Sequence, residues 1–406
     1  MKTVAQRKEQ LLTRGLEDVI VRDELARRLD GRKSLRVKFG IDPTGDRIHL
    51  GHAVVYWKLR EFQELGHQVI ILIGDYTAMI GDTSDKSAER QQLSREDVRH
   101  NMKSYLEQIG KIVDLSKAEI RYNSEWLKQL EFADILLLAS EFKVAQMLER
   151  DNFKVRYENG KPIGLQEFLY PVMQGYDSVA LHADIELGGN DQLFNMMAGR
   201  TLQKRSNQVP QAVMVTELLI GPDGKKMSKT QPNCIFITDE PKDMYGKVMA
   251  LNDELIPHYF KLATDVDLEI VEAIERDMAT GANPRDTKAS LAREIVGRYY
   301  GAKVAEAAEE AWNKQFRAGE MPTDISDYRA DDKELADPVG LMANAFGLTK
   351  SEIRRLISQD GVRIDGTVVE LADDIELRAG MTIQIGKRRF VRIQVWMYGL
   401  RHTCLL

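Results

Sequence analysis

The first half of the chain alternates short strand-like runs with longer helix-like segments, and this alternation constrains the fold more than any other feature. Residues 35–42 read as a strand that ends at a turn, residues 68–74 are a continuous apolar run bounded by glycine, and residues 50–65 between them carry apolar residues at helical spacing. Further helical patterns cover 94–111, 132–150 and 191–203, and short strands are expected at 183–187 and 211–215. Such alternation predicts an α/β fold with a parallel sheet and crossover helices. Ligands of that architecture lie at the carboxyl ends of the strands.

The amino-acid composition of the sequence changes after residue 230. Residues 241–317 are rich in Ala, Glu and Lys with few β-branched runs, which predicts a helical domain over 231–325. The acidic stretch at 326–338 is expected to be a linker. Residues 339–393 combine two short helices with short strands, and Asp365-Gly366 signals a hairpin there. We therefore expect an α/β domain at 1–230, these three segments, and an unassigned tail at 394–406.

Composition excludes several classes of protein. A hydrophobic content of 43% is enough for a packed core, and no apolar run approaches the roughly 18 residues of a membrane span. Two cysteines cannot build a disulfide framework or a multi-cysteine zinc site. The net charge of −6 requires any nucleic acid to meet a local basic patch. Because the start of the chain lacks the apolar stretch of a signal peptide, we expect a cytoplasmic protein with no membrane contact.

Residues 49–52 read His-Leu-Gly-His and stand between the first strand and the first long helix. The amino terminus of a helix exposes free N–H groups and partial positive charge, which favours anions. Gly51 lets a nucleotide approach closely, and His49 and His52 add donors to a phosphate. For this motif alone, a helix cap or a core position is the more common outcome. Its place in the first strand–helix unit favours phosphate binding.

A second motif, Lys-Lys-Met-Ser-Lys-Thr at residues 225–230, follows the last strand of the alternating region. Lysines on a loop can close over a polyphosphate and balance charge as a leaving group departs. The alternative is a solvated basic turn, which is the usual fate of such a run. Finding both motifs in one α/β domain favours the phosphate interpretation.

A third pattern is the row Tyr170, Gln174 and Asp177, spaced i, i+4 and i+7. This spacing puts three polar groups on one helix face. The row could bind a phenol, an amine or a carboxylate, or it could simply face water. Because the apolar residues between them leave no clear solvated side, the row is interpreted as a binding face.

The two phosphate motifs resemble the HIGH and KMSKS signatures of class I aminoacyl-tRNA synthetases, with Thr230 in place of the final Ser. Within that class, the polar row resembles the substrate helix of tyrosyl-tRNA synthetases, as do Asp42-Pro43-Thr44 and residues 188–192. Residues 348–393 resemble the S4 RNA-binding domain of bacterial-type members. The resemblance implies a Rossmann-like catalytic domain, an α-helical anticodon-region domain and a small α+β S4-like domain.

The resemblance also implies an activity, that of a tyrosine–tRNA ligase. Such an enzyme activates L-tyrosine with ATP to tyrosyl-adenylate and pyrophosphate, then transfers tyrosine to the 3′-terminal adenosine of tRNA(Tyr). ATP is then a substrate that comes with Mg²⁺, no dedicated protein metal site is expected, and a homodimer is implied. The chemistry needs no protein nucleophile, because positioning and electrostatic stabilisation carry such a transfer.

Residue roles follow from the matched motifs. The ATP phosphates would be bound by His49, Gly51, His52 and Thr44. The pyrophosphate would be stabilised by Lys226 and Lys229, with Lys86 and Arg90 joining the same loop closure. Gly40 would pass close to the nucleotide, and Asp191 would lie near the ribose. Asp177 would accept the hydrogen bond of the phenol, Asp82, Tyr170 and Gln174 would hold the α-ammonium group, and Gln192 would lie near the carboxylate.

Two departures from the family pattern stand out. Lys38 occupies a place where some family members have a tyrosine that contacts the phenol, and Thr83 and Asp85 stand where Pro and Gly are common.

A local cluster of basic residues predicts that the small domain at 339–393 binds RNA. Its candidates for RNA binding are Lys350, Arg354, Arg355, Lys387, Arg388 and Arg389. A solvated basic face is the alternative for any one of these residues, whereas the cluster inside a small domain favours RNA.

Two rivals to the ligase are a non-catalytic RNA-binding paralogue that kept the fold and a relative that charges tryptophan. The presence of His49, His52, Lys226 and Lys229 favours an enzyme. Asp177 and the S4-like end disfavour tryptophan.

Overall fold

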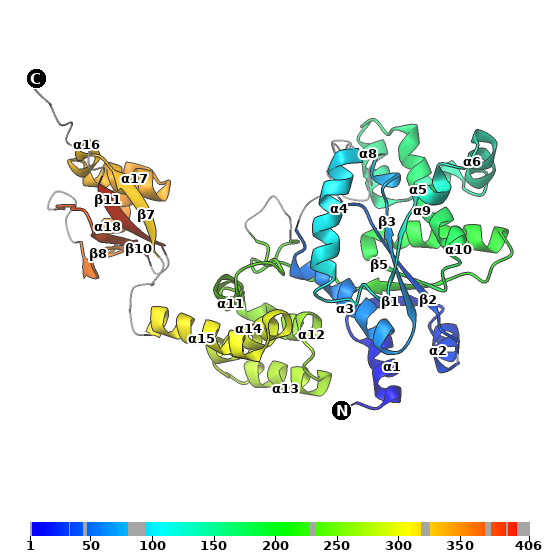
Figure 1. Cartoon of the computed structure of the whole chain (residues 1–406), viewed down its shortest axis with the longest axis horizontal. Helices are drawn as coiled ribbons and strands as arrows, with labels where there is room; N and C mark the ends of the chain where they lie inside the picture. The colour runs from blue at the N-terminus through cyan, green and yellow to red at the C-terminus, as the bar shows by residue number, and fades with distance from the viewer. Residues whose placement is uncertain are drawn as a thin grey trace, which may run out of the picture. The chain divides into compact units, whose positions relative to one another are not determined.

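The computed structural model describes residues 2–31, 33–43, 47–79, 95–227, 233–317, 325–369, 375–386 and 389–395. The chain divides into two compact units, Met1–Glu309 and Glu310–Leu406. Figure 1 labels the elements of each unit. Among the described residues, none of the helices is both long enough and apolar enough to span a bilayer.

Unit 1 is built on a sheet whose six described strands follow the order β1-β6-β5-β2-β3-β4. They are β1 (Leu16–Ile20), β2 (Arg36–Ile41), β3 (Gln68–Ile73), β4 (Glu119–Tyr122), β5 (Ile185–Gly189) and β6 (Ala212–Thr216). The strands from β2 to β6 pair in parallel, whereas β1 pairs antiparallel with β6. The parallel α/β fold expected from the sequence is confirmed.

The helices of this part cross over between the strands. They are α1 (Val4–Thr13), α2 (Arg22–Asp30), α3 (Leu50–Glu64), α4 (Arg95–Ile109), α5 (Ser124–Leu127), α6 (Phe132–Ala139), α7 (Val144–Leu148), α8 (Asp151–Glu158), α9 (Leu165–Ala180) and α10 (Leu193–Arg205), with the 3₁₀ turns η1 (Thr77–Met79) and η2 (Asn190–Gln192). The run Val69–Ile73 of β3 is buried throughout, as a central parallel strand requires. In Figure 1, α4 and α10 lie on opposite sides of the strands.

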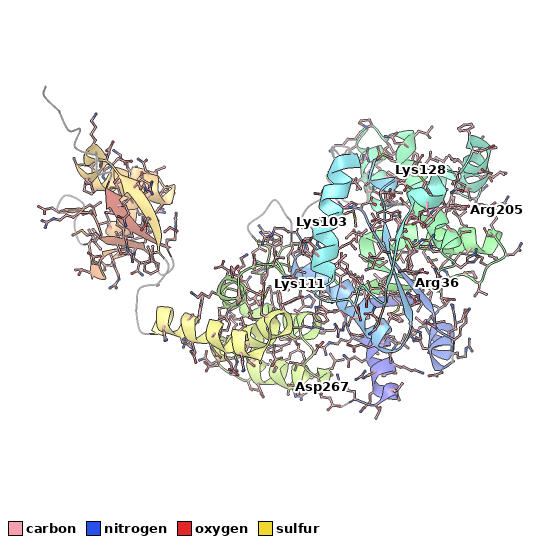
Figure 2. All side chains as sticks on the ribbon, in the orientation of Figure 1. Arg36, Lys103, Lys111, Lys128, Arg205 and Asp267 are labelled. Carbon is pink, nitrogen blue, oxygen red and sulfur yellow. The ribbon has the colours of Figure 1, made fainter. Side chains whose placement is uncertain are left out.

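The helices after the last strand of this sheet begin within unit 1, and the final one, α15, ends beyond residue 309. They are α11 (Pro241–Met249), the 3₁₀ turn η3 (Asp253–Leu255), α12 (Ile256–Ala263), α13 (Leu268–Ala279), α14 (Pro284–Tyr300) and α15 (Ala302–Arg317). Helix α12 contacts α3. Lys2 Nζ lies 2.5 Å from Oδ1 of Asp267, the residue before α13, and Figure 2 labels Asp267. The helical region is therefore joined to the amino-terminal segment as well as to α3.

Arg14, just after α1, provides the most extensive of these links. Its guanidinium group donates to four backbone carbonyls at the end of α12 and beyond, namely those of Phe260 (3.0 Å), Lys261 (2.8 Å), Thr264 (2.8 Å) and Val266 (2.6 Å). The side chain is buried, and burial lowers the pKa of Arg14. A positive charge at a helix carboxyl terminus satisfies carbonyls that have no partner within the helix.

Unit 2 is a small α+β domain with the strand order β7-β11-β10-β8-β9. Its elements are β7 (Ser326–Ala330), α16 (Asp332–Leu335), α17 (Pro338–Phe346), α18 (Lys350–Ile357), β8 (Val362–Ile364), β9 (Thr367–Val368), β10 (Thr382–Ile385) and β11 (Arg389–Val395). Asp365 and Gly366 both have positive φ and turn β8 into β9, as the sequence predicts.

The stretch 326–338 differs from its expected role as a linker. It forms β7, which pairs in parallel with β11, followed by α16 and the start of α17. Ala330 is fully buried in the core of the small domain. The acidic side chains there include helix caps, since Asp337 Oδ1 accepts from Gly340 N at 3.0 Å.

Candidate active site

A chain of hydrogen bonds connects the carboxyl ends of three neighbouring strands to α9. After β2, Asp42 accepts from the hydroxyl of Tyr170 at 2.8 Å and from Thr77 Oγ1 at 3.0 Å. After β4, Asn123 Nδ2 donates to Thr77 Oγ1 at 3.0 Å and to Asp177 Oδ2 at 3.4 Å. Two residues of the predicted polar row thus meet the strand ends, where an α/β fold binds its ligands.

Asp177 is a buried carboxylate with two side-chain donors. It is 2% exposed, and Trp126 Nε1 donates to its Oδ1 at 2.8 Å, alongside Asn123. Burial raises the pKa of Asp177 to about 7, opposed by Lys38, Trp126 and Asn123. Neither Trp126 nor Asn123 could be selected from the sequence, because neither shares a motif or a helix face with Asp177.

Beneath α9 lies a buried ion pair that the sequence analysis did not foresee. Lys38 Nζ of β2 is 2.9 Å from Glu186 Oε1 of β5, and both side chains are essentially unexposed. Gln174 Nε2 donates to Glu186 Oε1 at 3.3 Å. Lys38 therefore contacts a carboxylate inside the fold.

Two glycines allow the close packing of this region. A Cβ atom at Gly74 would overlap Asp42 Oδ1, so a side chain there would displace the carboxylate that accepts from Tyr170. On α9, a Cβ atom at Gly175 would come within 2.9 Å of the backbone of Ala198 on α10. Glycine is therefore needed on both sides of the candidate tyrosine site.

The histidine motif forms the start of α3. His49 caps the helix, and its Nδ1 accepts from His52 N at 3.4 Å. The two imidazole rings are stacked with centroids 3.7 Å apart. A Cβ atom at Gly51 would lie 3.0 Å from His49 Nδ1, whereas one at the exposed Gly40 would meet nothing within 4 Å. The structure thus shows a capping role for His49 at a helix amino terminus suited to anions.

The segment that follows the lysine motif pairs with the residues on either side of His49. Leu50 N donates to Ile235 O at 2.9 Å, and Ile237 N donates to Ile48 O at 3.0 Å. Asn233 Nδ2 donates to the carbonyl of Lys226 at 3.2 Å. The two phosphate motifs, far apart in sequence, therefore belong to one corner of the fold.

The other predicted site residues divide into described and undescribed positions. Asp191 is exposed in η2, and Gln192 Oε1 accepts from Asn195 Nδ2 at 3.0 Å. Outside the described residues lie Thr44, Asp82, Lys86, Arg90, Lys229, Lys387 and Arg388.

In unit 2, the predicted RNA-binding residues have two kinds of surroundings. Arg354 and Arg355 are exposed on α18. Lys350 Nζ lies 2.6 Å from Asp337 Oδ2, and Arg389 donates to the carbonyl of Phe346 at the end of α17. Lys350 and Arg389 therefore also hold elements of the small domain together.

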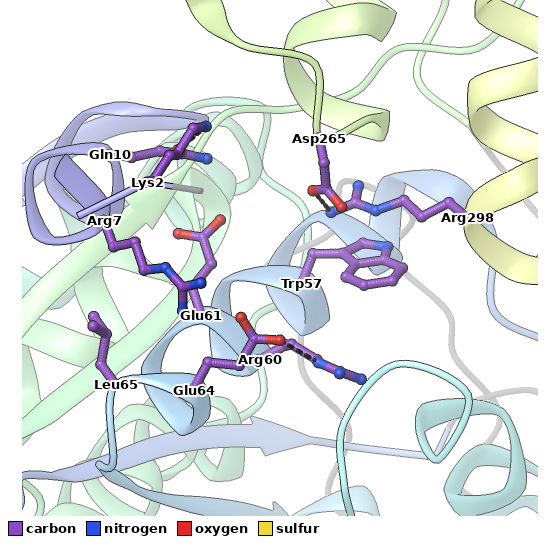
Figure 3. Close-up of a pocket in the computed structure, with 10 residues that line it drawn as sticks. All are labelled: Lys2, Arg7, Gln10, Trp57, Arg60, Glu61, Glu64, Leu65, Asp265 and Arg298. Atoms are coloured by element: carbon purple, nitrogen blue, oxygen red, sulfur yellow. Dashed lines mark hydrogen bonds and ion pairs between the residues drawn. The ribbon is translucent and has the colours of Figure 1, made fainter. Parts of the chain in front are cut away.

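A cavity of about 210 Å³ lies elsewhere in unit 1, between α1, α3 and α14. Figure 3 shows Arg298 lying over Trp57, at 3.6 Å from the ring centroid, and Arg60 paired with Glu64. The lining shares no residue with the network around Asp177. This cavity marks the junction of the sheet domain and the helical region.

Comparison with known proteins identifies the family. The family described as tRNA synthetases class I (W and Y) matches residues 30–317. Tyrosine–tRNA ligases of Shewanella oneidensis and Thermotoga maritima are 46% and 45% identical to this chain, covering 94% of it and 97% and 96% of the relatives. A tyrosine–tRNA ligase 2 of Vibrio cholerae is 44% identical over 95% of the chain and 97% of the relative. The chain belongs to the tyrosyl-tRNA synthetases of this class.

Solved structures agree on the fold. A tyrosyl-tRNA synthetase of Archaeoglobus fulgidus, complexed with L-tyrosine, has a TM-score of 0.60 at 22% identity, covering 76% of this chain and 100% of the other. A C-terminally truncated mitochondrial tyrosyl-tRNA synthetase of Aspergillus nidulans has a TM-score of 0.62 at 23% identity, covering 78% and 95%. Both likenesses support the Rossmann-like architecture.

Proposed function

We propose that the chain attaches tyrosine to tRNA(Tyr) in two steps, through tyrosyl-adenylate, and that the network around Asp177 selects the amino acid. Relatives named tyrosine–tRNA ligase match almost the whole chain, which supports neither a non-catalytic paralogue nor a tryptophan enzyme. The observation that carries the choice of substrate is the buried Asp177 carboxylate. Trp126 and Asn123 supply two donors, and a carboxylate accepts about four, so there is capacity for a phenolic hydroxyl.

The remaining residues of the tyrosine site would surround the amino acid. Tyr170 and Gln174 would hold its ammonium group together with Asp82, and Gln192 would lie near its carboxylate. Asp42 supports this arrangement, because its carboxylate fixes the Tyr170 hydroxyl.

The nucleotide would lie along the start of α3. His49, Gly51 and His52, with Thr44, would bind the phosphates, while Gly40 and Asp191 would lie close to the nucleoside. Lys226 and Lys229, joined by Lys86 and Arg90, would neutralise the pyrophosphate as it leaves. The backbone pairing of Ile48 and Leu50 with the segment after the lysine motif supports this joint action.

These groups can perform the transfer without a covalent enzyme intermediate. The tyrosine carboxylate attacks the α-phosphorus of ATP, the bond to the bridging oxygen breaks, and pyrophosphate departs with that electron pair. A terminal ribose hydroxyl of tRNA then attacks the carbonyl carbon of the adenylate, and AMP leaves. The protein contributes orientation and positive charge, which are the large terms for such reactions.

Mg²⁺ would enter with ATP. Among the described residues, no cluster of three His, Cys, Asp or Glu side chains could hold a metal ion. The proposal rests on the chemistry of triphosphates, whose oxygens commonly bind Mg²⁺ together with water.

Amino-acid-dependent ATP–pyrophosphate exchange tests the proposed function. We expect exchange with tyrosine and none above background with phenylalanine or tryptophan. His52→Ala should slow exchange about 100-fold, because removing one preorganised donor to a developing charge costs about that much. His258→Ala is the matched control, since His258 lies on α12, outside both motifs, and contacts the carbonyl of Leu218. Exchange supported by tryptophan would contradict the assignment. So would the absence of exchange with all three amino acids.

For unit 2, RNA binding by an S4-like domain is proposed from its basic residues. Arg354 and Arg355 are exposed on one helix and would contact the phosphate backbone together with Lys350, Lys387, Arg388 and Arg389. The exposure of the two arginines supports this role.

A homodimer is proposed from the family resemblance and from one exposed surface. Between α6 and the start of α9, large apolar side chains are 55–78% exposed, and we call them the apolar patch: Phe132, Leu136, Leu137, Val144, Val155, Tyr157 and Leu165. Exposed apolar side chains, when they gather on one surface, usually mark a protein interface. A second copy of the chain can bury the same patch on both subunits of a two-fold dimer.

Charge introduced into the patch should dissociate the dimer. We expect the wild-type protein to sediment as a dimer and the double variant Leu136→Glu, Leu137→Glu to sediment as a monomer, because burying two unpaired carboxylates opposes association. Ile270→Glu is the control, since Ile270 is 52% exposed on α13 outside the patch, and it should stay dimeric. A monomeric wild type, or a dimeric double variant, would refute this interface.

A further inference from the structure

Lys38 and Glu186 form a charged pair where a parallel sheet normally has apolar side chains. They are register partners on the adjacent strands β2 and β5, with exposures of 0% and 1%. Burying two charges carries a desolvation penalty of several kcal/mol per ion, and well-packed apolar replacements are often neutral or stabilising. Stability alone therefore gives no reason for this pair.

The contacts of the pair converge on the substrate helix. Lys38 Nζ donates to Ser178 Oγ at 2.8 Å and to the carbonyl of Gln174 at 3.1 Å. Glu186 accepts from Ser178 Oγ at 3.1 Å and from Gln174 Nε2 at 3.3 Å. Gln211 Nε2 also donates to Glu186. The pair thus fixes α9 at the residues that flank Asp177 on its inner face.

We propose that Lys38 and Glu186 are positioning residues for tyrosine recognition: they hold Gln174 and Ser178 of α9 against the sheet, and with them Asp177, the group that would accept the phenolic hydrogen bond. This inference rests on the proposed function and assigns to the pair a role in substrate selection.

The electrostatics of Asp177 support the proposal. Burial raises its pKa, and the largest opposing influence is Lys38, followed by the hydrogen bonds from Trp126 and Asn123. Glu186 acts in the same direction as burial and is the smallest of these influences. Lys38 lies on β2 and Glu186 on β5, whereas Trp126 lies on α5 and Asn123 is the residue before α5. The positive charge of Lys38 thus favours the ionised form of Asp177, and the negative charge of Glu186 disfavours it.

The pH dependence of kcat/KM for tyrosine, measured by pyrophosphate exchange, tests this role. In the wild type, kcat/KM should rise with pH as Asp177 ionises. Lys38→Met removes the positive charge, so Asp177 should stay protonated to higher pH and the midpoint should rise by about one unit. Glu186→Gln removes a negative charge, so the midpoint should fall. A midpoint one unit higher lowers kcat/KM about fivefold at pH 7.

Opposite shifts separate this role from a merely structural one, because loss of folded protein lowers activity without moving the midpoint. Lys58→Met is the matched control: Lys58 is also buried and lies 2.8 Å from Glu61 on α3, and its loss should leave the midpoint unchanged. The double variant Lys38→Met, Glu186→Gln should return towards the wild-type midpoint.

Unchanged midpoints, or shifts in the same direction in both single variants, would overturn the inference. If Lys38→Met does not fold, Glu186→Gln decides alone, and a midpoint that does not fall overturns it. Absence of tyrosine-dependent exchange in the wild type would instead refute the proposed function, so the two failures are distinguishable.

Discussion

Replacing Asp177 with asparagine is expected to reduce the preference for tyrosine over phenylalanine by roughly 10- to 150-fold, because a hydrogen bond to a charged group contributes about 1.5–3 kcal/mol. Asparagine keeps the size of the side chain, and its carbonyl can still accept from Trp126 Nε1, 2.8 Å from the present carboxylate. The ratio of kcat/KM values for the two amino acids in pyrophosphate exchange measures the effect. It should be largest above pH 7, where Asp177 is ionised.

Asp277→Asn provides the control for this experiment. Asp277 is exposed on α13, so removing its charge should leave the preference unchanged. If Asp177→Asn retained the full preference for tyrosine over phenylalanine, other groups would recognise the phenol. The role assigned to Asp177 in the polar row on α9 would then be wrong.

Arg14→Met is expected to destabilise unit 1 by at least about 3 kcal/mol, since each buried carbonyl left without a donor costs about 1–3 kcal/mol. Methionine preserves much of the buried apolar stem but cannot donate to the carbonyls of Phe260, Lys261, Thr264 and Val266. The urea midpoint of the unfolding transition of unit 1, followed by tryptophan fluorescence, measures the loss.

Arg22→Met serves as the comparison for the stability experiment. Arg22 is exposed at the start of α2, where substitutions usually change stability by less than about 0.5 kcal/mol. Equal midpoints for the two variants would mean that Arg14 does not hold the helical region to the amino-terminal segment.

Local sequence patterns predicted strands and helices whose apolar side chains are fully buried, and they missed strands that are only partly buried. The continuous apolar run of β3 and the spacing of α3 predicted those elements. β1 was missed, because Leu16–Ile20 is only partly buried and carries two acidic residues. The segment that forms β7 was expected as a linker, because its polar sequence becomes a strand only through pairing with β11, far along the chain.

The candidate site shows the same limit. Motif spacing predicted roles for His49, His52 and the polar row of α9, because the members of each motif are close in sequence. It could not reveal Trp126 or Asn123, which reach Asp177 from another element, nor the pairing of Lys38 with Glu186 across two strands. Such partners follow from tertiary packing, and no local periodicity encodes them.

The tight packing at Gly175 has a practical consequence for redesign. Because any larger residue there would strike the backbone of Ala198, a substitution at this position would force α9 away from α10. Attempts to make the enzyme accept unnatural amino acids should therefore change the side chains that the helix presents, or the strand residues below it, and leave the helix axis where it is. In a library that randomises residue 175, most variants would have the polar row of α9 displaced.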